Sequence, residues 1–322
     1  MRSSTSASEG LSPSRAIVLL LVGLAAYFLV LELFARDVLP RLSENQRRIA
    51  ADNSAALALR PRAASGATTV LLVGNSLLLH SIDRERLAQL MGPQYQVTLY
   101  PVEGTAYLDW AYGLRRLFAG GSRPAVVVLC ISAKHVLADV TAGEGFAYLL
   151  MRLEDLPGVV RESHLNMMNA SAYFFANLSG WLGTRTTFRD GLMLKWLPDA
   201  QALADRFIDR EPVHMVADAS SLERAVQRLQ SVDTLTAQYG ARFIWLEPPT
   251  LNLKDIGPEL AAAANAAHVP ALMPSLPGTM AHAAFLDGFH TNARGAAEFT
   301  QLTADALQQE LAAQGPGSGQ PR

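Results

Sequence analysis

Two short segments near opposite ends of the chain carry the residue types of a nucleophilic catalyst. Ser76 follows an apolar run, and Asp287 and His290 stand three residues apart in a polar loop before a helical pattern. This spacing lets the carboxylate accept a hydrogen bond from one imidazole nitrogen, which leaves the other nitrogen free to take a proton from a serine hydroxyl. Taken singly, Gly-Asn-Ser is typical of a plain turn, and Asp-x-x-His of a surface pair before a helix. Together the two segments supply a nucleophile, a base and an orienting carboxylate.

Four further polar residues stand near the expected carboxyl ends of strands. Asn75 directly precedes Ser76, Lys134 and His135 follow the third apolar run, and Glu247 follows the fourth. Ligands of open α/β sheets bind beyond the carboxyl ends of the strands. We therefore expect these four side chains to line a substrate site, and ordinary turn and surface roles are the alternative.

The sequence predicts neither a metal site nor a cofactor. The one cysteine, Cys130, lies inside an apolar run, so a Cys-based zinc cluster and an intramolecular disulfide are both excluded. A dinucleotide glycine fingerprint, a phosphate-binding loop and a His-Glu-x-x-His metal motif are absent from the sequence. Lys and Arg total 27 against 29 for Asp and Glu, so there is no basic excess to neutralise phosphates and nucleic-acid binding is not expected.

Hydrophobic patterns predict the elements that would position these residues. Short apolar runs alternate with amphipathic helical segments such as Arg84–Met91 and Leu222–Tyr239. Runs that are apolar at every position indicate strands covered on both faces, and their alternation with helices is typical of a parallel sheet. The predicted class is α/β with helices on both faces. The predicted strands are Thr68–Gly74, Gln96–Tyr100, Pro124–Ile131, Arg242–Leu246 and Val269–Met273.

An apolar segment near the N-terminus predicts a single transmembrane helix. The segment Ala16–Ala35 has Glu32 as its one charged residue, and as a helix it measures about 30 Å, which matches a bilayer core. A cleaved signal peptide and a buried core helix are the alternatives. The segment is apolar on all sides, however, and no small-x-small cleavage site stands out before Arg36. Arginines on both sides of the segment do not favour a cytoplasmic N-terminus.

The rest of the chain divides by composition. Residues 140–215 are rich in aromatic side chains and fit the strand–helix alternation less well, so they form either a helical insertion or ordinary core and loops. The predicted order is a polar N-terminus at 1–15, a membrane anchor at 16–35, a juxtamembrane stalk and linker at 36–66, an α/β domain at 67–312 and a flexible tail at 313–322.

The serine turn after the first strand, combined with Asp-x-x-His in the last loop, resembles the SGNH (GDSL-type) hydrolase superfamily. The segment Leu71-Leu-Val-Gly-Asn-Ser-Leu-Leu-Leu-His-Ser-Ile-Asp83 is most similar to the membrane-anchored SGNH-like proteins of bacterial polysaccharide and cell-wall acylation. The resemblance covers about residues 68–310 in order and spacing. It implies a flavodoxin-like sheet on which Ser76 is the nucleophile, His290 the general base and Asp287 its orienting partner.

The same resemblance implies the donors of an oxyanion hole. The backbone N–H groups of Ser76 and of Gly104, in the loop after the second strand, are the first two. The family has a third donor in the asparagine of a Gly-x-Asn-Asp block, which this sequence lacks, and Ser132 lies nearest to that place. The sequence also has Gly-Asn-Ser where the family has Gly-Asp-Ser. Losing one oxyanion donor lowers a rate by about 10²–10³-fold.

The resemblance implies a function at the bacterial inner membrane. The expected protein is an acyl esterase or O-acyltransferase with residues 1–15 in the cytoplasm and its domain in the periplasm, acting on an acylated glycan or exopolysaccharide without a cofactor. A membrane-bound O-acyltransferase is an implied partner. One alternative is a catalytically weak or inactive SGNH-like module that binds glycan or scaffolds an export or acylation complex. A cytosol-facing lipase is another, if the arginine distribution decides the orientation.

Overall fold

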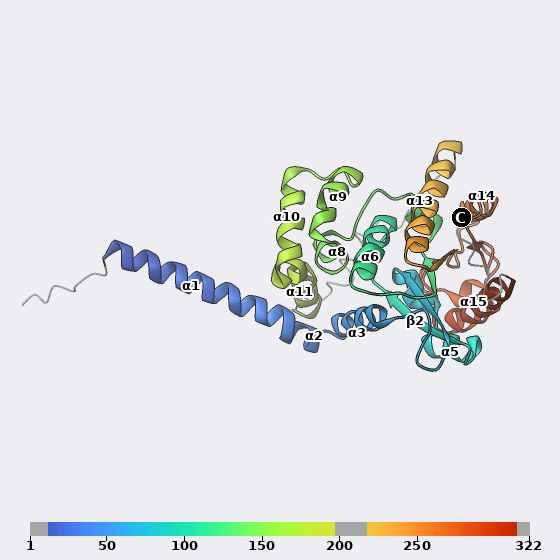
Figure 1. The fold of residues 1–322 in the computed structure, drawn as a ribbon, viewed down its shortest axis with the longest axis horizontal. Helices are drawn as coiled ribbons and strands as arrows, with labels where there is room; N and C mark the ends of the chain where they lie inside the picture. The colour runs from blue at the N-terminus through green and yellow to red at the C-terminus, as the bar shows by residue number, and fades with distance from the viewer. Residues whose placement is uncertain (1–11, 197–217, 314–322) are drawn as a thin grey trace, which may run out of the picture.

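The computed structural model describes residues 12–196 and 218–313 of the chain (Figure 1). Its centre is a sheet of five strands, and every neighbouring pair in the sheet is parallel. The strand order β2-β1-β3-β4-β5 is that of doubly wound, flavodoxin-like folds. The predicted α/β class with a parallel sheet is therefore confirmed. The strands are β1 (Thr68–Gly74), β2 (Tyr95–Pro101), β3 (Val126–Cys130), β4 (Arg242–Leu246) and β5 (Ala271–Leu272).

All five predicted strands are present, and β1 and β4 have the predicted ends. The register places Gly74 opposite both Pro101 and Cys130, and Cys130 opposite Leu246. The carboxyl ends of four strands therefore lie in one row, and the loops that leave them share one edge of the sheet. This edge is the expected place for a ligand.

Helices fill the connections between the strands and precede the sheet. Before β1 the chain forms α1 (Pro13–Leu33), a short π-helix η1 (Phe34–Val38), α2 (Leu39–Leu42) and α3 (Glu44–Ala58). The others are α4 (Ser76–Ser81), α5 (Arg84–Met91), α6 (Tyr107–Ala119), α7 (Ala133–Leu137), α8 (Gly143–Leu149), η2 (Leu153–Asp155), α9 (Leu156–Glu162), α10 (Met167–Leu178), α11 (Gly180–Trp196), α13 (Ala219–Gln238), α14 (Gly257–Ala266), η3 (His282–Ala284) and α15 (Ala293–Ala313).

Each face of the sheet has its own hydrophobic cluster. Leu71 and Val73 of β1 belong to a cluster completed by α3, α6, α8, α13 and α14. Val70 and Leu72 belong to a second cluster completed by α4, α5 and α15. All four side chains have no exposed surface. Alternate residues of one strand thus face opposite layers, which explains why the run is apolar at every position.

The N-terminal apolar segment forms one helix that projects away from the α/β domain (Figure 1). The continuous helical stretch Pro13–Arg41 has 29 residues, and it contains an 18-residue window with a mean hydropathy of 2.6 in which no residue is buried. By length and composition it is sufficient to cross a bilayer. Of the predicted N-terminus at 1–15 and the predicted tail at 313–322, residues 1–11 and 314–322 lie outside the described residues.

Two segments that lacked strand–helix alternation are largely helical. Within the predicted stalk and linker, α3 packs on the domain, and its residues Ile49 and Ala56 are buried in the first cluster. The Ser43 hydroxyl caps α3 by accepting a hydrogen bond from the N–H of Gln46. Of residues 140–215, the stretch 143–196 contains α8 to α11, and 197–217 lie outside the described residues.

Candidate active site

Ser76, His290 and Asp287 form one continuous chain of hydrogen bonds. The Ser76 Oγ lies 3.0 Å from His290 Nε2, and His290 Nδ1 lies 2.7 Å from Asp287 Oδ2. An ionised Asp287 requires the proton on Nδ1, so Nε2 is left to accept the serine proton. About a quarter of the His290 side chain is exposed, so the arrangement is open to a substrate from solvent. The two sequence segments singled out as catalytic, 214 residues apart, therefore meet in the geometry of a serine nucleophile with its base.

The turn that presents Ser76 depends on its two neighbours. Gly74 lies so close to β3 that a Cβ atom there would stand 2.2 Å from the Cys130 carbonyl oxygen. The Asn75 side chain accepts a hydrogen bond from the N–H of Leu77 and so caps α4, which begins at Ser76 itself. Ser76 is thus the first residue of a helix at the end of β1, where its backbone N–H has no partner within the helix.

Asn75 has a different position from the expected substrate-lining one. Its side chain is 2% exposed, and its amide nitrogen donates to the carbonyl oxygen of Thr105 at 3.1 Å. Since its oxygen already caps α4, both polar ends of the side chain are used inside the protein. Asn75 therefore joins the serine turn to the loop after β2 and leaves no exposed group for a substrate.

The Asp287 loop is held in shape by its own backbone bonds. Asp287 Oδ1 accepts hydrogen bonds from the N–H groups of Phe289 and His290 at 3.2 and 2.8 Å. Gly288, between Asp287 and Phe289, has φ +98°, a conformation that favours glycine. Partial burial by itself would raise the pKa of Asp287, but these bonds and the bond from the His290 ring outweigh it and hold the pKa below its usual value. The carboxylate that orients His290 is thus ionised at neutral pH.

Two further histidines flank His290. The ring of His80 lies 5.1 Å from that of His290, centroid to centroid. Burial, reinforced by His290, lowers the pKa of His80. Burial, followed by the charges of Lys134 and His290, lowers the pKa of His135 to about 4. Both flanking rings are therefore neutral at pH 7, and they place no fixed positive charge beside the base.

His135 makes the stability of the fold depend on pH. Its folded-state pKa of about 4 lies below the ordinary 6.5, so the unfolded chain binds more protons between these values. The free energy of unfolding must then fall as the pH falls through this window, by about 3 kcal/mol across the whole of it. Urea unfolding at pH 7 and pH 4.5 measures the loss, and His135→Gln is expected to reduce it. Equal pH dependence in the two proteins would contradict the assignment.

Lys134, His135 and Ser132 lie together at the start of α7. The Ser132 Oγ is 2.7 Å from His135 Nδ1, and Ser132 is 5% exposed. The Lys134 ammonium lies over the Phe289 ring, 5.1 Å from its centroid, which brings Lys134 to the loop of the candidate base. Lys134 and His135 therefore lie near the loop of the candidate base, and their contact with a substrate stays a prediction. The Ser132 hydroxyl is hydrogen-bonded to the His135 ring.

Glu247 is placed behind the site instead of at its surface. The side chain is 1% exposed, and its Oε2 accepts a hydrogen bond from the N–H of Ala133 at the start of α7. Burial, with the nearby Asp255, raises the pKa of Glu247 well above its usual value. This buried acid therefore supports the loop of Ser132 and Lys134, and it has no surface with which to line a substrate.

The loop after β2 carries Gly104 beside the serine turn. The Val102 N–H donates to the Gly74 carbonyl oxygen at 2.9 Å, and Asn75 holds Thr105 as described. Gly104 has φ +74°, and a Cβ atom there would meet nothing within 4 Å. The loop is thus fixed at both sides of Gly104, and the glycine itself is unobstructed. Its N–H as an oxyanion donor stays a prediction.

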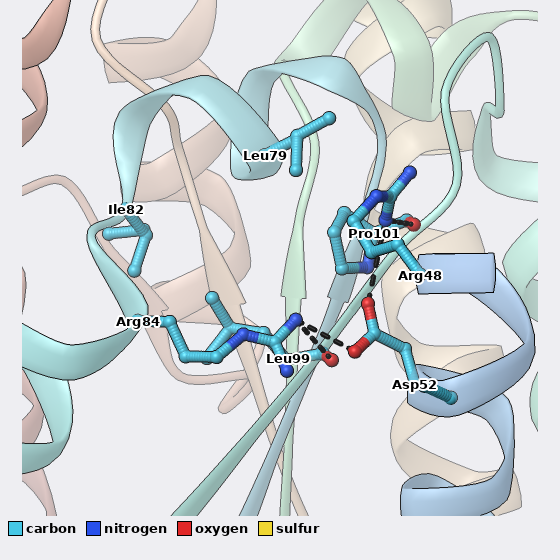
Figure 2. A pocket seen from close by; sticks show the side chains of 8 residues that line it. Arg48, Asp52, Leu79, Ile82, Arg84, Leu99 and Pro101 are labelled. Carbon is cyan, nitrogen blue, oxygen red and sulfur yellow. Dashed lines mark hydrogen bonds and ion pairs between the residues drawn. The ribbon is translucent and has the colours of Figure 1, made fainter. Parts of the chain in front are cut away.

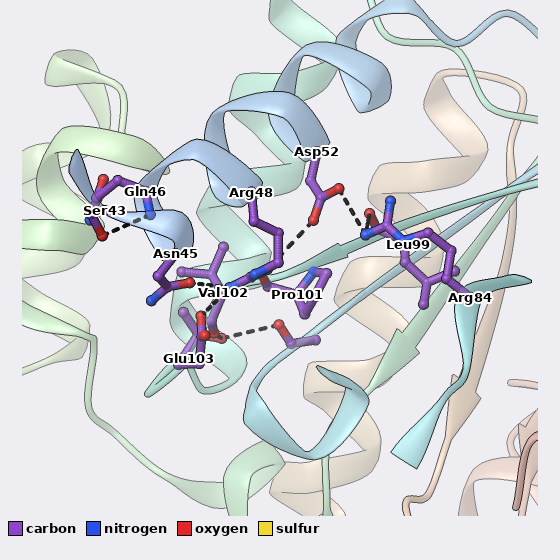
Figure 3. Close-up of polar contacts among 12 residues, drawn as sticks. Ser43, Asn45, Gln46, Arg48, Asp52, Arg84, Leu99, Pro101, Val102 and Glu103 are labelled. Atoms are coloured by element: carbon purple, nitrogen blue, oxygen red, sulfur yellow. Dashed lines mark hydrogen bonds and ion pairs between the residues drawn. The ribbon is translucent and has the colours of Figure 1, made fainter. Parts of the chain in front are cut away.

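Arg48 of α3 binds this loop from the side of the N-terminal helices (Figures 2 and 3). Its guanidinium donates to the Pro101 carbonyl oxygen at 2.7 Å and to Glu103 Oε2 at 2.6 Å. The buried carboxylate of Asp52 contacts both Arg48 and Arg84. A cavity of about 350 Å³ lies between these residues, and none of the three predicted catalytic side chains lines it. The charged side chains around the cavity pair with one another, and the contacts of Arg48 join α3 to the loop.

The contribution of Arg48 was not predicted from the sequence. Its partner Glu103 stands 55 residues away, and the segment that contains Arg48 has the pattern of a stalk. The only available signal was that Glu103 directly precedes Gly104, the predicted oxyanion residue. No spacing rule connects an arginine on one helix to a carbonyl and a carboxylate on a distant loop.

Loss of Arg48 is expected to lower activity through the Gly104 loop. Removing a complete oxyanion donor costs about 10²–10³ in rate, so displacing the loop in Arg48→Ala should lower kcat/KM by roughly 10-fold to 100-fold. Arg84→Ala is the matched control, because Arg84 shares Asp52 but contacts the Leu99 carbonyl instead of the loop. Acyl-ester hydrolysis measures both. Equal losses in the two variants would point to general destabilisation instead of loop positioning.

No protein-family model matches the sequence, and no curated protein matches it closely. Among solved structures, that of TesA is matched with a TM-score of 0.37 at 16% identity, over 76% of this chain and 100% of that one. The structure of Est24, a carbohydrate acetylesterase from Sinorhizobium meliloti, is matched with a TM-score of 0.38 at 12% identity, over 76% of this chain and 99% of that one. The structure of an inhibitor-bound aryl esterase from M. smegmatis is matched with a TM-score of 0.35 at 13% identity, over 76% of this chain and 100% of that one.

The strand order and the positions of the three predicted catalytic residues can be compared directly with what the resemblance implies. The strand order is β2-β1-β3-β4-β5, the serine follows β1, and Asp-x-x-His precedes the last helix. Ser76, His290 and Asp287 are joined by hydrogen bonds at the carboxyl edge of the sheet. This α/β chain therefore has the fold and the serine–histidine–aspartate arrangement that its resemblance to the SGNH hydrolases implies.

Proposed function

We propose that the protein is an SGNH-type serine hydrolase that cleaves or transfers an acyl ester. The observation that carries this proposal is the hydrogen-bonded chain Ser76–His290–Asp287. A surface serine without a base is a weak nucleophile, whereas a serine bound to an oriented imidazole is the usual device of acyl transfer. The lowered pKa of Asp287 supports it, since only the carboxylate form keeps His290 in the required tautomer.

The geometry supports a two-step reaction. Ser76 Oγ attacks the acyl carbonyl carbon while its proton moves to His290 Nε2, and the carbonyl oxygen becomes an oxyanion. The N–H groups of Ser76 and Gly104 are the proposed donors to that oxygen. The leaving alkoxide takes the proton from His290, and an acyl-serine remains. Water or a sugar hydroxyl then attacks the acyl carbon while its proton moves to His290 Nε2. The bond between the acyl carbon and Ser76 Oγ breaks, and Oγ takes the proton back from His290. Attack by water releases the free acid, which is hydrolysis, and attack by the sugar forms a new ester, which is transfer.

A membrane anchor would decide which esters the enzyme meets. The helix Pro13–Arg41 supports anchoring by one span, and residues 44–58 continue directly into the domain as α3. We propose a bacterial inner-membrane protein with its domain in the periplasm, acting on an acylated glycan or exopolysaccharide. A membrane-bound O-acyltransferase that delivers the acyl group is a partner consistent with this place.

The experiment uses the full-length protein in detergent micelles with an O-acetylated polysaccharide and, separately, an activated acetyl ester. Release of acetate by wild type and its loss in Ser76→Ala would support hydrolysis. Appearance of the acetyl group on an added sugar acceptor would support transfer. Equal acetate release by wild type and Ser76→Ala would overturn the proposal.

A second function is favoured by the third donor position of the oxyanion hole. Ser132 lies nearest to the place where the family has asparagine, and its hydroxyl is bound to His135. A module with so weak an oxyanion hole could bind glycan or scaffold an acylation complex without turnover. Polysaccharide binding that is equal in wild type and Ser76→Ala, with no acetate release by either, would favour this function.

A further inference from the structure

Helix α10 presents a largely apolar face to its surroundings. Its exposed residues other than Asn169 stand at positions i, i+1, i+4, i+7, i+8 and i+11, which is one side of an α-helix. Apart from one serine they are all large and apolar, and the helix contains no charged residue. The exposed fractions of Met167, Met168 and Phe175 are 86, 73 and 54%. The face consists of Met167, Met168, Ser171, Phe174, Phe175 and Leu178.

The C-terminal end of α10 lies at the end of the apolar span. The Glu32 carboxylate of α1 accepts hydrogen bonds from the Ser179 hydroxyl at 2.7 Å and from the Gly180 N–H at 2.8 Å. Ser179 is the residue that joins α10 to α11. Glu32 is also the one charged residue of the apolar segment Ala16–Ala35 and stands near its end. The end of α10 is therefore held at the depth where the span leaves the hydrocarbon core.

Aromatic packing adds to this connection. The Phe34 ring contacts Trp181 and Phe188 of α11, with centroids 6.4 and 5.5 Å apart. On its other side α10 is fixed to the domain, because the Asn177 amide donates to the carbonyl oxygens of Ala147 and Met151. In Figure 1, α10 stands at the edge of the domain nearest α1 and runs across the direction of α1. A helix so placed lies along a bilayer that α1 crosses.

We infer that the exposed face of α10 docks on the lipid bilayer, with its apolar side chains at the boundary between headgroups and acyl chains. The inference rests on the proposed membrane anchor and adds a second contact to it. Helices that lie in the plane of a membrane bury their apolar face to a depth of about 5–10 Å at this boundary. Docking would fix the tilt of the domain, and with it the direction from which the candidate active site receives a membrane-linked substrate.

The test measures lipid contact at the centre of the face in the full-length protein. Ser171→Cys carries an environment-sensitive fluorophore, since the native Cys130 is fully buried and inaccessible to the label. The protein is reconstituted in phosphatidylcholine–phosphatidylglycerol vesicles with and without doxyl-labelled lipid. We expect strong quenching of a fluorophore at position 171 and little quenching at Ser231→Cys on α13. A fluorophore at Leu24→Cys in the span should be quenched by doxyl groups that lie deeper in the bilayer. Ser231 is exposed on a helix of the domain.

The three positions separate the inference from the anchor. Quenching at Leu24→Cys without quenching at Ser171→Cys would overturn docking and leave the anchor intact. No quenching at either position would overturn both. A blue-shifted but unquenched fluorophore at Ser171→Cys would show that another protein surface, such as a second copy, covers the face, and would overturn the inference.

A matched pair of charged variants tests the face itself. Phe175→Asp, measured with the fluorophore at 171, should lower the quenching several-fold, because a carboxylate at this level disfavours insertion. Asn169→Asp places the same charge on α10 outside the face and should leave the quenching unchanged. Asn169 is exposed and stands on a different side of the helix. Equal quenching in both variants would overturn the inference.

Discussion

Replacing Ser76 by alanine is expected to abolish covalent labelling by a fluorophosphonate probe and to lower acyl-ester hydrolysis by about 10⁴-fold or more. The probe reacts only with an activated hydroxyl, and Ser76 Oγ is the one bound to His290 Nε2, at 3.0 Å. The substitution removes the nucleophile and creates no strain, because alanine also fits the first turn of α4. The full-length protein in detergent gives both measurements.

His290→Ala should cost nearly as much as Ser76→Ala, and the double variant little more than either one. The two side chains act as a unit: without the base the hydroxyl stays protonated, and without the hydroxyl the base has nothing to activate. Additive losses would mean that each residue contributes to a separate step. Thermal unfolding of each variant near the wild-type temperature establishes that the loss is chemical.

Ser231→Ala is the control for the serine variant. Its hydroxyl is exposed on α13, where it donates to the carbonyl oxygen of Gln227 within the same helix, so labelling should be unchanged. A wild-type protein that unfolds cooperatively but takes no label would contradict an activated Ser76. That outcome would shift the interpretation towards the glycan-binding module, in which the serine geometry is retained without turnover.

The sheet and the ends of the site could be predicted because both are local patterns. A run such as Val70–Val73 within β1 is apolar at every position only when both faces are covered, and the glycine that follows it marks the strand end. Asp287 and His290 share one turn, so their spacing alone brings carboxylate and ring together. The order of such elements then placed Ser76 and His290 at one edge of the sheet.

Roles that depend on long-range side-chain contacts could not be predicted. Asn75 has the place of a substrate-lining residue, but its two polar ends are used by Leu77 and Thr105, which no spacing reveals. Glu247 follows a strand as a ligand would, yet the packing around it leaves the carboxyl buried. Arg48 likewise acts on a loop that lies far away in the sequence. In each case burial or a long-range contact decides the role, and both depend on the whole fold.

Asp287→Asn should lower acyl-ester hydrolysis by about 10³–10⁴-fold while the loop keeps its shape. The asparagine oxygen can still accept from the N–H groups of Phe289 and His290, so the turn survives. Its amide would then face His290 Nδ1 with a donor in place of an acceptor. The imidazole must turn to the other tautomer, with the proton on Nε2, and it can no longer accept the proton of Ser76.

The size of this loss distinguishes tautomer control from mere proximity of charge. Asp287 has nearly half of its side chain exposed, so an electrostatic contribution alone would be screened and would amount to a few-fold change. Asp218→Asn is the matched control, since Asp218 also accepts a hydrogen bond from a backbone N–H, that of Ser221, at an exposed position and asparagine caps a helix equally well. A loss below about tenfold in Asp287→Asn would show that water at this open position can select the tautomer. The hydrogen bond from His290 Nδ1 to Asp287 would then be a property of the loop and not of the catalysis.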